Sequence, residues 1–365
     1  MSRPHVLFCN WRDTHNPEGG GSERYVEHMA RGLVERGYRV TIFCSAYEGA
    51  RGVVYRDGIR FVHRGSKLMI YVRALIGLAL RQFGPVDVVV DVQNGLPFFT
   101  RLATRKPVVV LVHHVHREQW PVVYPGLMGK IGWLIESKIA PLLYRKSHYV
   151  AVSQATKREL AELGVDDQRI TVIHNGNDPA PATTSTRAAE PTIVVVGRLV
   201  PHKQVEHAID AVRDLAGLGV SLDIVGDGWW AEELHTYAEA KGVSDRVRFH
   251  GFVDDLEKHE VLARAWVMAL PSLKEGWGLV VGEAGLHDVP TVAYRSAGGT
   301  TESIDDHFSG LLVDTPAEFT AALQLVLTDE RLRDDLGTHA QKKSQAFTWD
   351  CSEELFARAI ASPER

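Results

Sequence analysis

Two glutamates stand eight positions apart in the segment "EGWGLVVGE", residues 275 to 283. The other residues of this segment are glycine, tryptophan and branched aliphatics, a composition typical of buried chain. A buried carboxylate is costly unless something pairs with it or binds to it. Glu275 follows the strand-like "VMALPS", and Glu283 lies about two helical turns further on, near the same face. We therefore expect the two carboxylates to bind hydroxyl groups of a ligand, and to be less well paired without it.

Two basic residues lie in "VVVGRLVPHKQVEHAIDAV", on the loop between an apolar strand and a helix that we expect to begin near Gln204. Arg198 and Lys203 add two fixed cations to the N-terminus of that helix, and all three favour negative charge at one point. The pattern predicts a diphosphate site. A solvated basic loop is the alternative, and it fits a single lysine better than this spacing after a buried strand.

A glycine-rich loop follows the first predicted strand, in "NPEGGGSERYVEHMARGLVERG". Gly19, Gly20 and Gly21 let a ligand approach the backbone closely. The helix that follows presents free N–H groups to an anion such as phosphate. We expect Ser22 to cap this helix without a reciprocal bond, because Tyr25 stands where a capping box needs glutamate or glutamine. A flexible surface turn explains the loop equally well.

Three histidines follow another apolar run in "PVVVLVHHVHREQW". Strand alternation places His113 on one face and His114 on the other, with His116 two residues beyond. A histidine at a strand end suits donation to a substrate hydroxyl or to developing charge, although a satisfied core histidine explains His113 as well. A metal site would need more ligands at suitable spacing. Two further tight turns follow predicted strands, at "IVGDGWW" with Gly226 and at "YRSAGGTTESIDD" with Gly298 and Gly299.

The elements that carry these motifs are short β-branched runs alternating with helical patterns. We expect strands at "HVLFCNW", "RVTIFC", "VDVVVDV", "PVVVLVHH", "HYVAVS", "ITVIHN", "TIVVVGRL", "SLDIVGDG", "VRFHGF", "VMALPS" and "TVAY". This order predicts an α/β protein with two doubly wound, mostly parallel sheets. The segment "NDPAPATTSTRAAEPT", residues 177 to 192, is typical of a linker. We expect domains over 1–180 and 181–345, and a helix over 346–365 that packs on either. Ligands of such sheets bind at the carboxyl ends of the strands, so the cleft between the domains is the expected site.

Length and composition limit the class of protein. A chain of 365 residues favours two domains. A net charge of −5 argues against a chain-wide footprint for nucleic acid. The apolar stretch from Val6 to Cys9 is too short for a secretory signal or a membrane span, so we expect a cytoplasmic protein. Cys9, Cys44 and Cys351 are expected to be reduced thiols.

The motifs, in this order, resemble the retaining glycosyltransferases of the GT-B architecture, specifically family four, which includes bacterial mannosyl- and glucosyltransferases. The resemblance covers most of the chain. It implies two facing Rossmann-like domains with an interdomain cleft, the donor bound mainly by the second domain and the acceptor mainly by the first. The motifs that carry it are "GGGSE", "VVVLVHH", "VSQATKREL" followed by "VIHNGND", "VVGRLVPHK", "IVGDG", "PSLKEGWGLVVGEA" and "GGTTESI".

The resemblance also implies roles for individual residues. Arg198 and Lys203 match the family's diphosphate-binding pair. Glu275 matches the glutamate that contacts hydroxyls of the donated sugar, and Glu283 the one that contacts the ribose. His113 matches a histidine that binds the transferred sugar, so the implied catalytic residues are His113, Arg198, Lys203 and Glu275. The other donor-binding positions that the resemblance implies are Gly20, Gly21, Gly226, Phe252, Gly276, Trp277, Gly278 and Leu279.

Three positions depart from the family pattern. Gln204 replaces the glycine that follows the phosphate-binding lysine, and Asp288 replaces the glycine of "EAMAxGxP". Trp277 is the aromatic residue of the motif that usually reads "EGFG". None of the three replaces a charged site residue, so the departures bear on local packing more than on donor binding.

The implied reaction moves a hexose-type sugar, with retention, from a UDP or GDP donor to a hydroxyl acceptor, either lipid-linked or a small natural product. Its transition state resembles an oxocarbenium ion. Arg198, Lys203 and helix N-termini would stabilise the charge that grows on the diphosphate. No metal or other cofactor is then needed, and the chain has no Asp-x-Asp motif. The alternatives are a GT-B-like nucleotide-sugar epimerase or hydrolase, and a nucleotide-sugar-binding protein without turnover.

The acceptor is not specified by these motifs. Two segments, "SKLMIYVRALIGLALRQFG" and "GLMGKIGWLIESKIAPLLYRK", carry apolar stripes with interspersed basic residues. Basic amphipathic helices can lie on anionic membranes, which would place the protein at the inner face of the membrane. Core helices with snorkelling edges are the alternative. The basic residues concerned are Lys67, Arg73, Arg81, Lys130, Lys138, Arg145 and Lys146.

Overall fold

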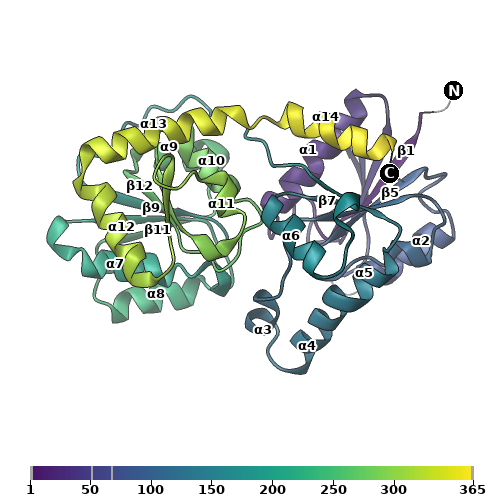
Figure 1. The fold of residues 1–365 in the computed structure, drawn as a ribbon, viewed down its shortest axis with the longest axis horizontal. Helices are drawn as coiled ribbons and strands as arrows, with labels where there is room; N and C mark the ends of the chain where they lie inside the picture. The colour runs from purple at the N-terminus through teal and green to yellow at the C-terminus, as the bar shows by residue number, and fades with distance from the viewer. Residues whose placement is uncertain (1–2, 51, 67–68, 363–365) are drawn as a thin grey trace. The chain divides into compact units, whose positions relative to one another are not determined.

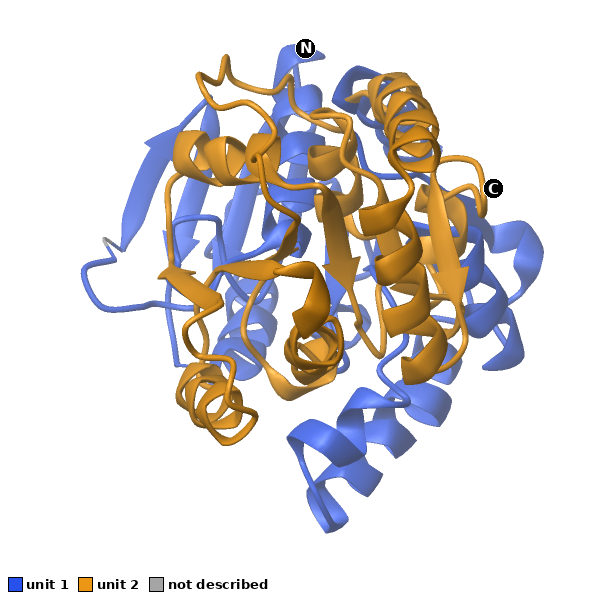
Figure 2. Ribbon diagram, turned by 90° about the vertical axis from the view of Figure 1, so that its left-hand side faces the viewer, with its two compact units in different colours: residues 1–176, 349–365 blue, residues 177–348 orange. Residues whose placement is uncertain are grey.

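The chain divides into two compact units, one of residues 1–176 with 349–365 and one of residues 177–348 (Figure 2). The structure is a computed structural model that describes residues 3–50, 52–66 and 69–362. The division falls at the first residue of the segment expected to be a linker. The C-terminal helix, which could have packed on either domain, belongs to the first unit.

Unit 1 is built on an eight-stranded sheet with the order β3-β4-β2-β1-β5-β6-β7-β8 (Figure 1). Neighbouring strands are parallel except β3 and β4, which are antiparallel. The strands are β1 (His5–Cys9), β2 (Arg39–Cys44), β3 (Val53–Arg56), β4 (Ile59–His63), β5 (Val88–Gln93), β6 (Val108–Val112), β7 (His148–Ala151) and β8 (Ile170–Val172).

The hairpin of β3 and β4 was not among the predicted strands. Asp57 and Gly58 form its turn, and both have positive φ, at 50° and 75°. Such a turn matches the right-handed twist of the strands on either side, and Asp-Gly is a favoured pair for it. The hairpin adds an antiparallel edge to a sheet that is otherwise parallel.

The helices of unit 1 lie between its parallel strands along the chain, except for α14, which follows unit 2. They are α1 (Gly21–Glu35), α2 (Met69–Ala79), α3 (Gln119–Val123), α4 (Leu127–Leu134), α5 (Ala140–Leu143), α6 (Gln154–Glu162) and α14 (Trp349–Ala361), with the short 3₁₀ helices η1 (Thr100–Leu102) and η3 (Asp167–Arg169). A π-helix, η2 (Ile135–Ile139), joins α4 to α5 without a break.

The C-terminal helix α14 packs against α1. The ring of Trp349 stacks on that of His28, with centroids 4.0 Å apart, and Phe356 stacks on Phe8 of β1 at 5.8 Å. Gly32 of α1 makes this approach possible, because a Cβ there would lie 2.5 Å from the Cβ of Glu353. The last helix is therefore a structural part of unit 1.

Unit 2 is built on a six-stranded sheet with the order β11-β10-β9-β12-β13-β14, and all its neighbouring strands are parallel. The strand order reverses at β9, whose neighbours are β10 and β12. The prediction of an α/β protein with two mostly parallel sheets is confirmed. The strands are β9 (Thr192–Val196), β10 (Ser221–Val225), β11 (Val247–Gly251), β12 (Val267–Leu270), β13 (Thr291–Tyr294) and β14 (Gly310–Val313).

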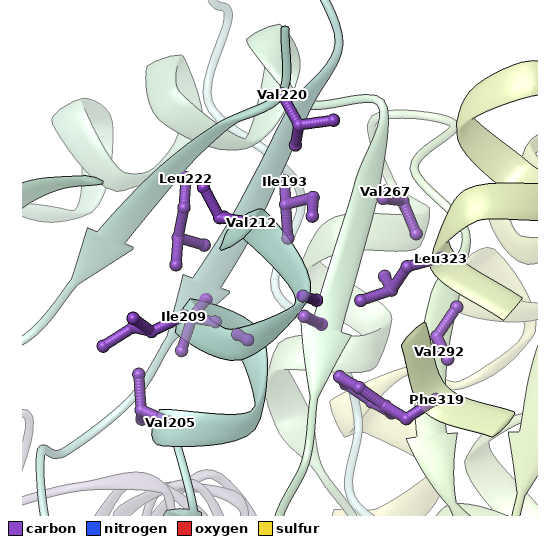
Figure 3. Close-up of a cluster of buried hydrophobic side chains, with 14 of the residues drawn as sticks. Ile193, Val205, Ile209, Val212, Val220, Leu222, Val267, Val292, Phe319 and Leu323 are labelled. Carbon is purple, nitrogen blue, oxygen red and sulfur yellow. The ribbon is translucent and has the colours of Figure 1, made fainter. Parts of the chain in front are cut away.

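Helices cover both faces of the second sheet. Alternate residues of β9 enter two different clusters, since Ile193 packs in one and Val194 in the other. Figure 3 shows the first cluster, in which Phe319 and Leu323 of α12 face the sheet. The helices are α7 (Glu206–Asp214), α8 (Ala231–Ala240), α9 (Asp255–Arg264), α10 (Leu279–Gly285), α11 (Thr300–Ser303), α12 (Pro316–Thr328) and α13 (Glu330–Ala346), with the 3₁₀ helices η4 (Pro201–Lys203), η5 (Ala216–Leu218) and η6 (Arg295–Ala297).

The cysteines are free thiols, as expected, with Cys9 and Cys44 buried and Cys351 exposed. Over residues 3–50, 52–66 and 69–362, no helix has the length and apolar character needed to cross a bilayer.

The close approach of α14 to α1 predicts the effect of Gly32→Ala. The added methyl group would overlap the Cβ of Glu353, and overpacking of this kind costs about 1 to 3 kcal/mol. We expect a lower urea-unfolding midpoint and faster proteolytic release of the C-terminal helix. The matched control is Gly217→Ala, where nothing lies within 4 Å of the new Cβ. Equal behaviour of the two variants would contradict this account of the packing.

Candidate functional site

Lys203, one of the two residues expected to bind the diphosphate, forms an ion pair with Glu275 in unit 2. Lys203 ends η4, which follows β9, and its Nζ lies 2.5 Å from Oε1 of Glu275 in the loop after β12. The side chains are 24% and 11% exposed. The pair therefore stands at the carboxyl ends of two adjacent strands, beside the point where the strand order reverses. That is the place where open parallel sheets bind their ligands.

Arg198 shares a small hollow with Lys203 at this edge of the sheet. The hollow is also lined by Gly197 and Ser272. The Ser272 hydroxyl is fully buried, and no described group bonds to it. A buried polar atom of this kind calls for a partner, and a hydroxyl beside two cations suits an anionic oxygen. Ser272 was not predicted from the sequence, although its place directly after the buried strand "VMALP" was a usable signal.

The second glutamate is also paired with a lysine. Glu283 lies on α10, and its Oε1 is 2.8 Å from Nζ of Lys258 on α9. Each of the two glutamates, which we expected to be less well paired without ligand, thus has a lysine partner within unit 2. The chain itself offsets the cost of each buried carboxylate by supplying a cation. A sugar hydroxyl that binds either carboxylate must share it with a lysine.

Glycines bring the loops at this edge into direct backbone contact. A Cβ at Gly226, after β10, would lie 2.0 Å from the carbonyl oxygen of Gly197. A Cβ at Gly299 would lie 2.1 Å from that of Gly276. The loop after β12 is also hydrogen-bonded to the loop after β13. The N–H of Glu275 donates to the carbonyl of Ala297, and the carbonyl of Glu275 accepts from the N–H of Gly299. The close approach of the loops therefore explains why these positions are glycine, whether or not they also contact a ligand.

At two positions that depart from the family pattern, the backbone still has the conformation that glycine favours. Gln204 and Asp288 have φ of 49° and 56°, in the left-handed region. A residue with a side chain pays about 1 to 2 kcal/mol for this conformation. The substitutions thus change the side chain and the local strain while the backbone keeps a left-handed turn.

The remaining predicted donor-binding residues differ in their exposure to solvent. The Trp277 ring is buried edge-on against Phe347, with centroids 4.9 Å apart, so it belongs to the core of unit 2. Gly278 has φ of 87° and precedes α10, whose first residue, Leu279, is half-buried. Phe252, in the segment after β11, is 83% exposed.

His113 follows β6 in unit 1 and is buried. Burial lowers the pKa of His113 to about 4, with a smaller effect in the same direction from His116. The ring lies edge-on to Tyr25 at 5.4 Å, and no described group bonds to its Nε2. The imidazole is therefore neutral near pH 7, and its Nε2 has a bond still to make.

The other two histidines of this segment already have protein partners. His114 Nε2 is 3.0 Å from Oε1 of Gln119, and His116 Nδ1 is 3.1 Å from Oε1 of Glu136. One ring nitrogen of each histidine therefore bonds to a side chain of unit 1.

One cluster of unit 1 has the side chains that bind metals. Asp13, Cys44 and His63 are buried, and their ligand atoms lie within 4.8 Å of one another. However, Oδ2 of Asp13 is 2.5 Å from Nη2 of Arg56 and 2.9 Å from Nε2 of His63. With a guanidinium already on the carboxylate, the cluster is better explained as a buried ion-pair network.

The glycine loop of unit 1 is capped differently from the prediction. Helix α1 begins at Gly21 with Gly20 as its N-cap. The carboxylate of Glu23 accepts from the N–H of Gly20 and from the hydroxyl of Ser22, each at 2.8 Å. Ser22 is therefore not the cap, because the helix starts two residues earlier than expected and places Glu23 at the third helical position. That glutamate supplies the reciprocal bond thought to be missing.

Comparison with solved structures defines the fold class. Sucrose-phosphate synthase from Thermosynechococcus elongatus matches with a TM-score of 0.83 at 17% identity, over 99% of this chain and 100% of that one. HepE of Anabaena in complex with UDP-glucose matches with a TM-score of 0.78 at 21% identity, over 98% and 99%. Together with the two α/β units, these likenesses place the chain in the GT-B fold class.

Comparison of sequences defines the family. The model described as Glycosyltransferase Family 4 matches residues 19–180, and that described as Glycosyl transferases group 1 matches residues 180–343. D-inositol 3-phosphate glycosyltransferase of Xylanimonas cellulosilytica is 29% identical over 91% of this chain and 89% of its own. A GDP-mannose-dependent alpha-(1-6)-phosphatidylinositol monomannoside mannosyltransferase of Mycobacterium tuberculosis is 27% identical over 82% of each chain. The chain belongs to the family-four, group 1 glycosyltransferases, and the resemblance seen in its motifs is confirmed.

The buried His113 predicts a specific pH dependence of stability. Its pKa in the folded protein is about 4, below the value of about 6.5 in an unfolded chain. The stability that depends on the neutral ring is thus fully present above pH 6.5 and is lost as the pH falls toward 4. We expect the unfolding free energy of His113→Phe to fall less steeply over this window, by up to about 1.4 kcal/mol per pH unit.

The comparison needs urea unfolding of both proteins at several pH values. Some slope will persist in the variant, because burial, with Lys258 nearby, also lowers the pKa of His259 to about 4. Parallel curves for wild type and variant would contradict the assignment of His113 as a neutral buried ring.

Proposed function

We propose that this glycosyltransferase moves a hexose from a UDP- or GDP-sugar to a hydroxyl acceptor, with retention and without a metal ion. The observation that carries the proposal is the Lys203–Glu275 pair beside Arg198, at the carboxyl ends of β9 and β12. Similar proteins support this donor class, since one is GDP-mannose-dependent and another binds UDP-glucose. Cations for the diphosphate and a carboxylate for the sugar then lie side by side.

The charges in unit 2 would act mainly on the leaving group. Negative charge grows on the diphosphate as its bond to the sugar breaks. Arg198 and Lys203 stabilise that charge in the transition state more than in the bound donor, which is how fixed charges accelerate a reaction. Because two side-chain cations serve this role, the step does not depend on a divalent metal.

The carboxylates would orient the two sugar rings of the donor. Glu275 accepts from hydroxyls of the transferred hexose, and Glu283 accepts from the ribose. Each remains bonded to its lysine on the other side, which fixes the rotamer of the carboxylate. His113 in unit 1 offers a neutral ring nitrogen to the hexose. The acceptor proton goes to the leaving phosphate oxygen on the same face of the sugar, so no protein base is assigned.

Removal of the Lys203 cation tests the diphosphate assignment. Lys203→Ala should abolish transfer, with a rate lower by about 100-fold or more. Loss of one preorganised group at a developing oxyanion has effects of this size. The measurement is release of nucleoside diphosphate from UDP-, GDP- and ADP-sugars in the presence of candidate acceptors. Lys342→Ala, on the exposed side of α13, is the matched control. Full activity of a folded Lys203→Ala protein would overturn the assignment.

The stereochemical course tests the proposed reaction itself. Starting from an α-linked nucleotide sugar, we expect an α-linked product, read from the anomeric proton coupling by NMR. A β-linked product would contradict retention. Incubation with donor alone should give little turnover, whereas a changed or released sugar under these conditions would favour an epimerase or a hydrolase.

A further inference from the structure

The helix of residues 127–143 in unit 1 turns its apolar side chains outward. It runs without a break through α4, η2 and α5. Leu127 and Leu142 are 72% and 68% exposed. A helix on the surface of a soluble domain normally has the opposite orientation, with its apolar stripe toward the core. The exposed apolar side chains, here called the outer face, are Leu127, Met128, Ile131, Leu134, Ile139 and Leu142.

The side of this helix that faces the protein has small and polar residues beside Trp133 and Leu143, which pack against the core. Gly132 is buried, and a Cβ there would lie 2.4 Å from the indole ring of Trp120. Glu136 is also buried, and its carboxylate accepts from Trp120 Nε1 at 2.6 Å and from the N–H of His116 at 3.1 Å. Turning the helix to bury its leucines would break these bonds and leave a buried carboxylate without donors. The exposure of the outer face is therefore built into the packing.

The π-helix contributes to this arrangement. Glu136 lies within η2, where one turn of the helix is wider than an α turn. The same carboxylate holds the backbone and ring of His116, three residues after His113. The helix with the exposed apolar face thus supports the loop that begins at the proposed sugar-binding histidine.

The exposed charges around the outer face all have one sign. Over residues 119–147 the charged residues that are exposed are Lys130, Lys138, Arg145 and Lys146, and the only acidic residue, Glu136, is 1% exposed. This is a local excess of positive charge in a chain of net charge −5. A second copy of the chain would bring the same cations against each other in a symmetric interface. Anionic lipid headgroups complement both the charge and the apolar side chains.

The outer face stands where a flat surface could reach it. Figures 1 and 2 both show the α3–α4 hairpin extending away from the rest of unit 1. Val122 and Tyr124, just before α4, add exposed apolar area. Helix α2 has the same character, since Val72 and Ile76 are exposed and its only charged residue is Arg73. Lys67, counted with this basic set in the sequence, lies outside the described residues.

We propose that the helix of residues 127–143 docks on an anionic membrane, with the outer face among the acyl chains and Lys130, Lys138 and Arg145 at the headgroups. The proposal rests on the proposed transferase function and names its acceptor class, a hydroxyl on the headgroup of a membrane lipid. Docking holds unit 1 at the surface through the same helix that supports the His113 loop. The acceptor hydroxyl is then delivered from the membrane rather than from solution.

Vesicle sedimentation of the full chain tests this docking. The vesicles are phosphatidylcholine alone, or phosphatidylcholine mixed with phosphatidylglycerol. We expect binding to the mixed vesicles at low salt and little to the neutral ones. Lys130→Gln with Lys138→Gln should weaken binding about 30-fold, because each basic residue near the surface contributes roughly 1 kcal/mol. Leu127→Ser, Ile131→Ser and Leu134→Ser together should abolish it.

Matched controls come from exposed residues elsewhere in the chain. Leu256→Ser with Leu325→Ser removes two exposed leucines of unit 2, and Lys342→Gln removes an exposed lysine. All three substitutions should leave vesicle binding unchanged. Thermal shifts with UDP- and GDP-sugars should be the same in every variant, which shows that each is folded and binds donor.

The outcomes separate docking from the proposed function. Absence of wild-type binding to anionic vesicles at low salt would overturn docking, as would equal binding by the wild type and the variants of the outer face. Sedimentation equilibrium that shows a dimer lost in the triple serine variant would assign the outer face to a second copy, and would also overturn it. Absence of donor binding by the wild type would instead overturn the proposed function, regardless of the result of vesicle sedimentation.

Discussion

Carboxylates buried among apolar residues must be given donors by the chain, and this requirement shapes both units. In unit 2 the Glu275 carboxylate is met by Lys203, across two adjacent strand ends. The loop that carries it is bonded to the loop after β13, and glycines let the two backbones touch. The charged groups of the site are thus held in place by the sheet before any ligand arrives. That is the preorganisation on which electrostatic catalysis depends.

In unit 1 the Glu136 carboxylate meets the same requirement with groups from the segment that follows β6. Glu136 is held by an indole, an imidazole and a backbone N–H. Those bonds occupy part of the inner side of the helix and leave the outer face exposed. The unusual surface of unit 1 and the position of the loop after β6 therefore have one cause. In unit 2, by contrast, a lysine shared with a carboxylate can also serve an anionic ligand.

The sequence was sufficient for the fold class and for most of the charged site. Strands such as β9 are apolar throughout because both faces are covered, and this pattern predicted the parallel sheets. The β3–β4 hairpin and β14 were missed, although the Asp-Gly turn of the hairpin was a usable signal. The bond between Lys203 and Glu275 joins residues 72 positions apart, so no local spacing could reveal it. Periodicity also could not tell which side of the helix 127–143 faces inward, because that depends on Trp120 and Glu136.

The central claim is that Lys203 serves both Glu275 and the diphosphate, and a double-mutant cycle on binding tests it most directly. Calorimetric titration with UDP and GDP would compare the wild type, Lys203→Met, Glu275→Gln and the double variant. The account predicts that Glu275→Gln preserves or tightens nucleoside diphosphate binding, because it frees the lysine, and that this effect disappears in the Lys203→Met background. Equal weakening by Glu275→Gln in both backgrounds would show that the two residues act separately and would contradict the account.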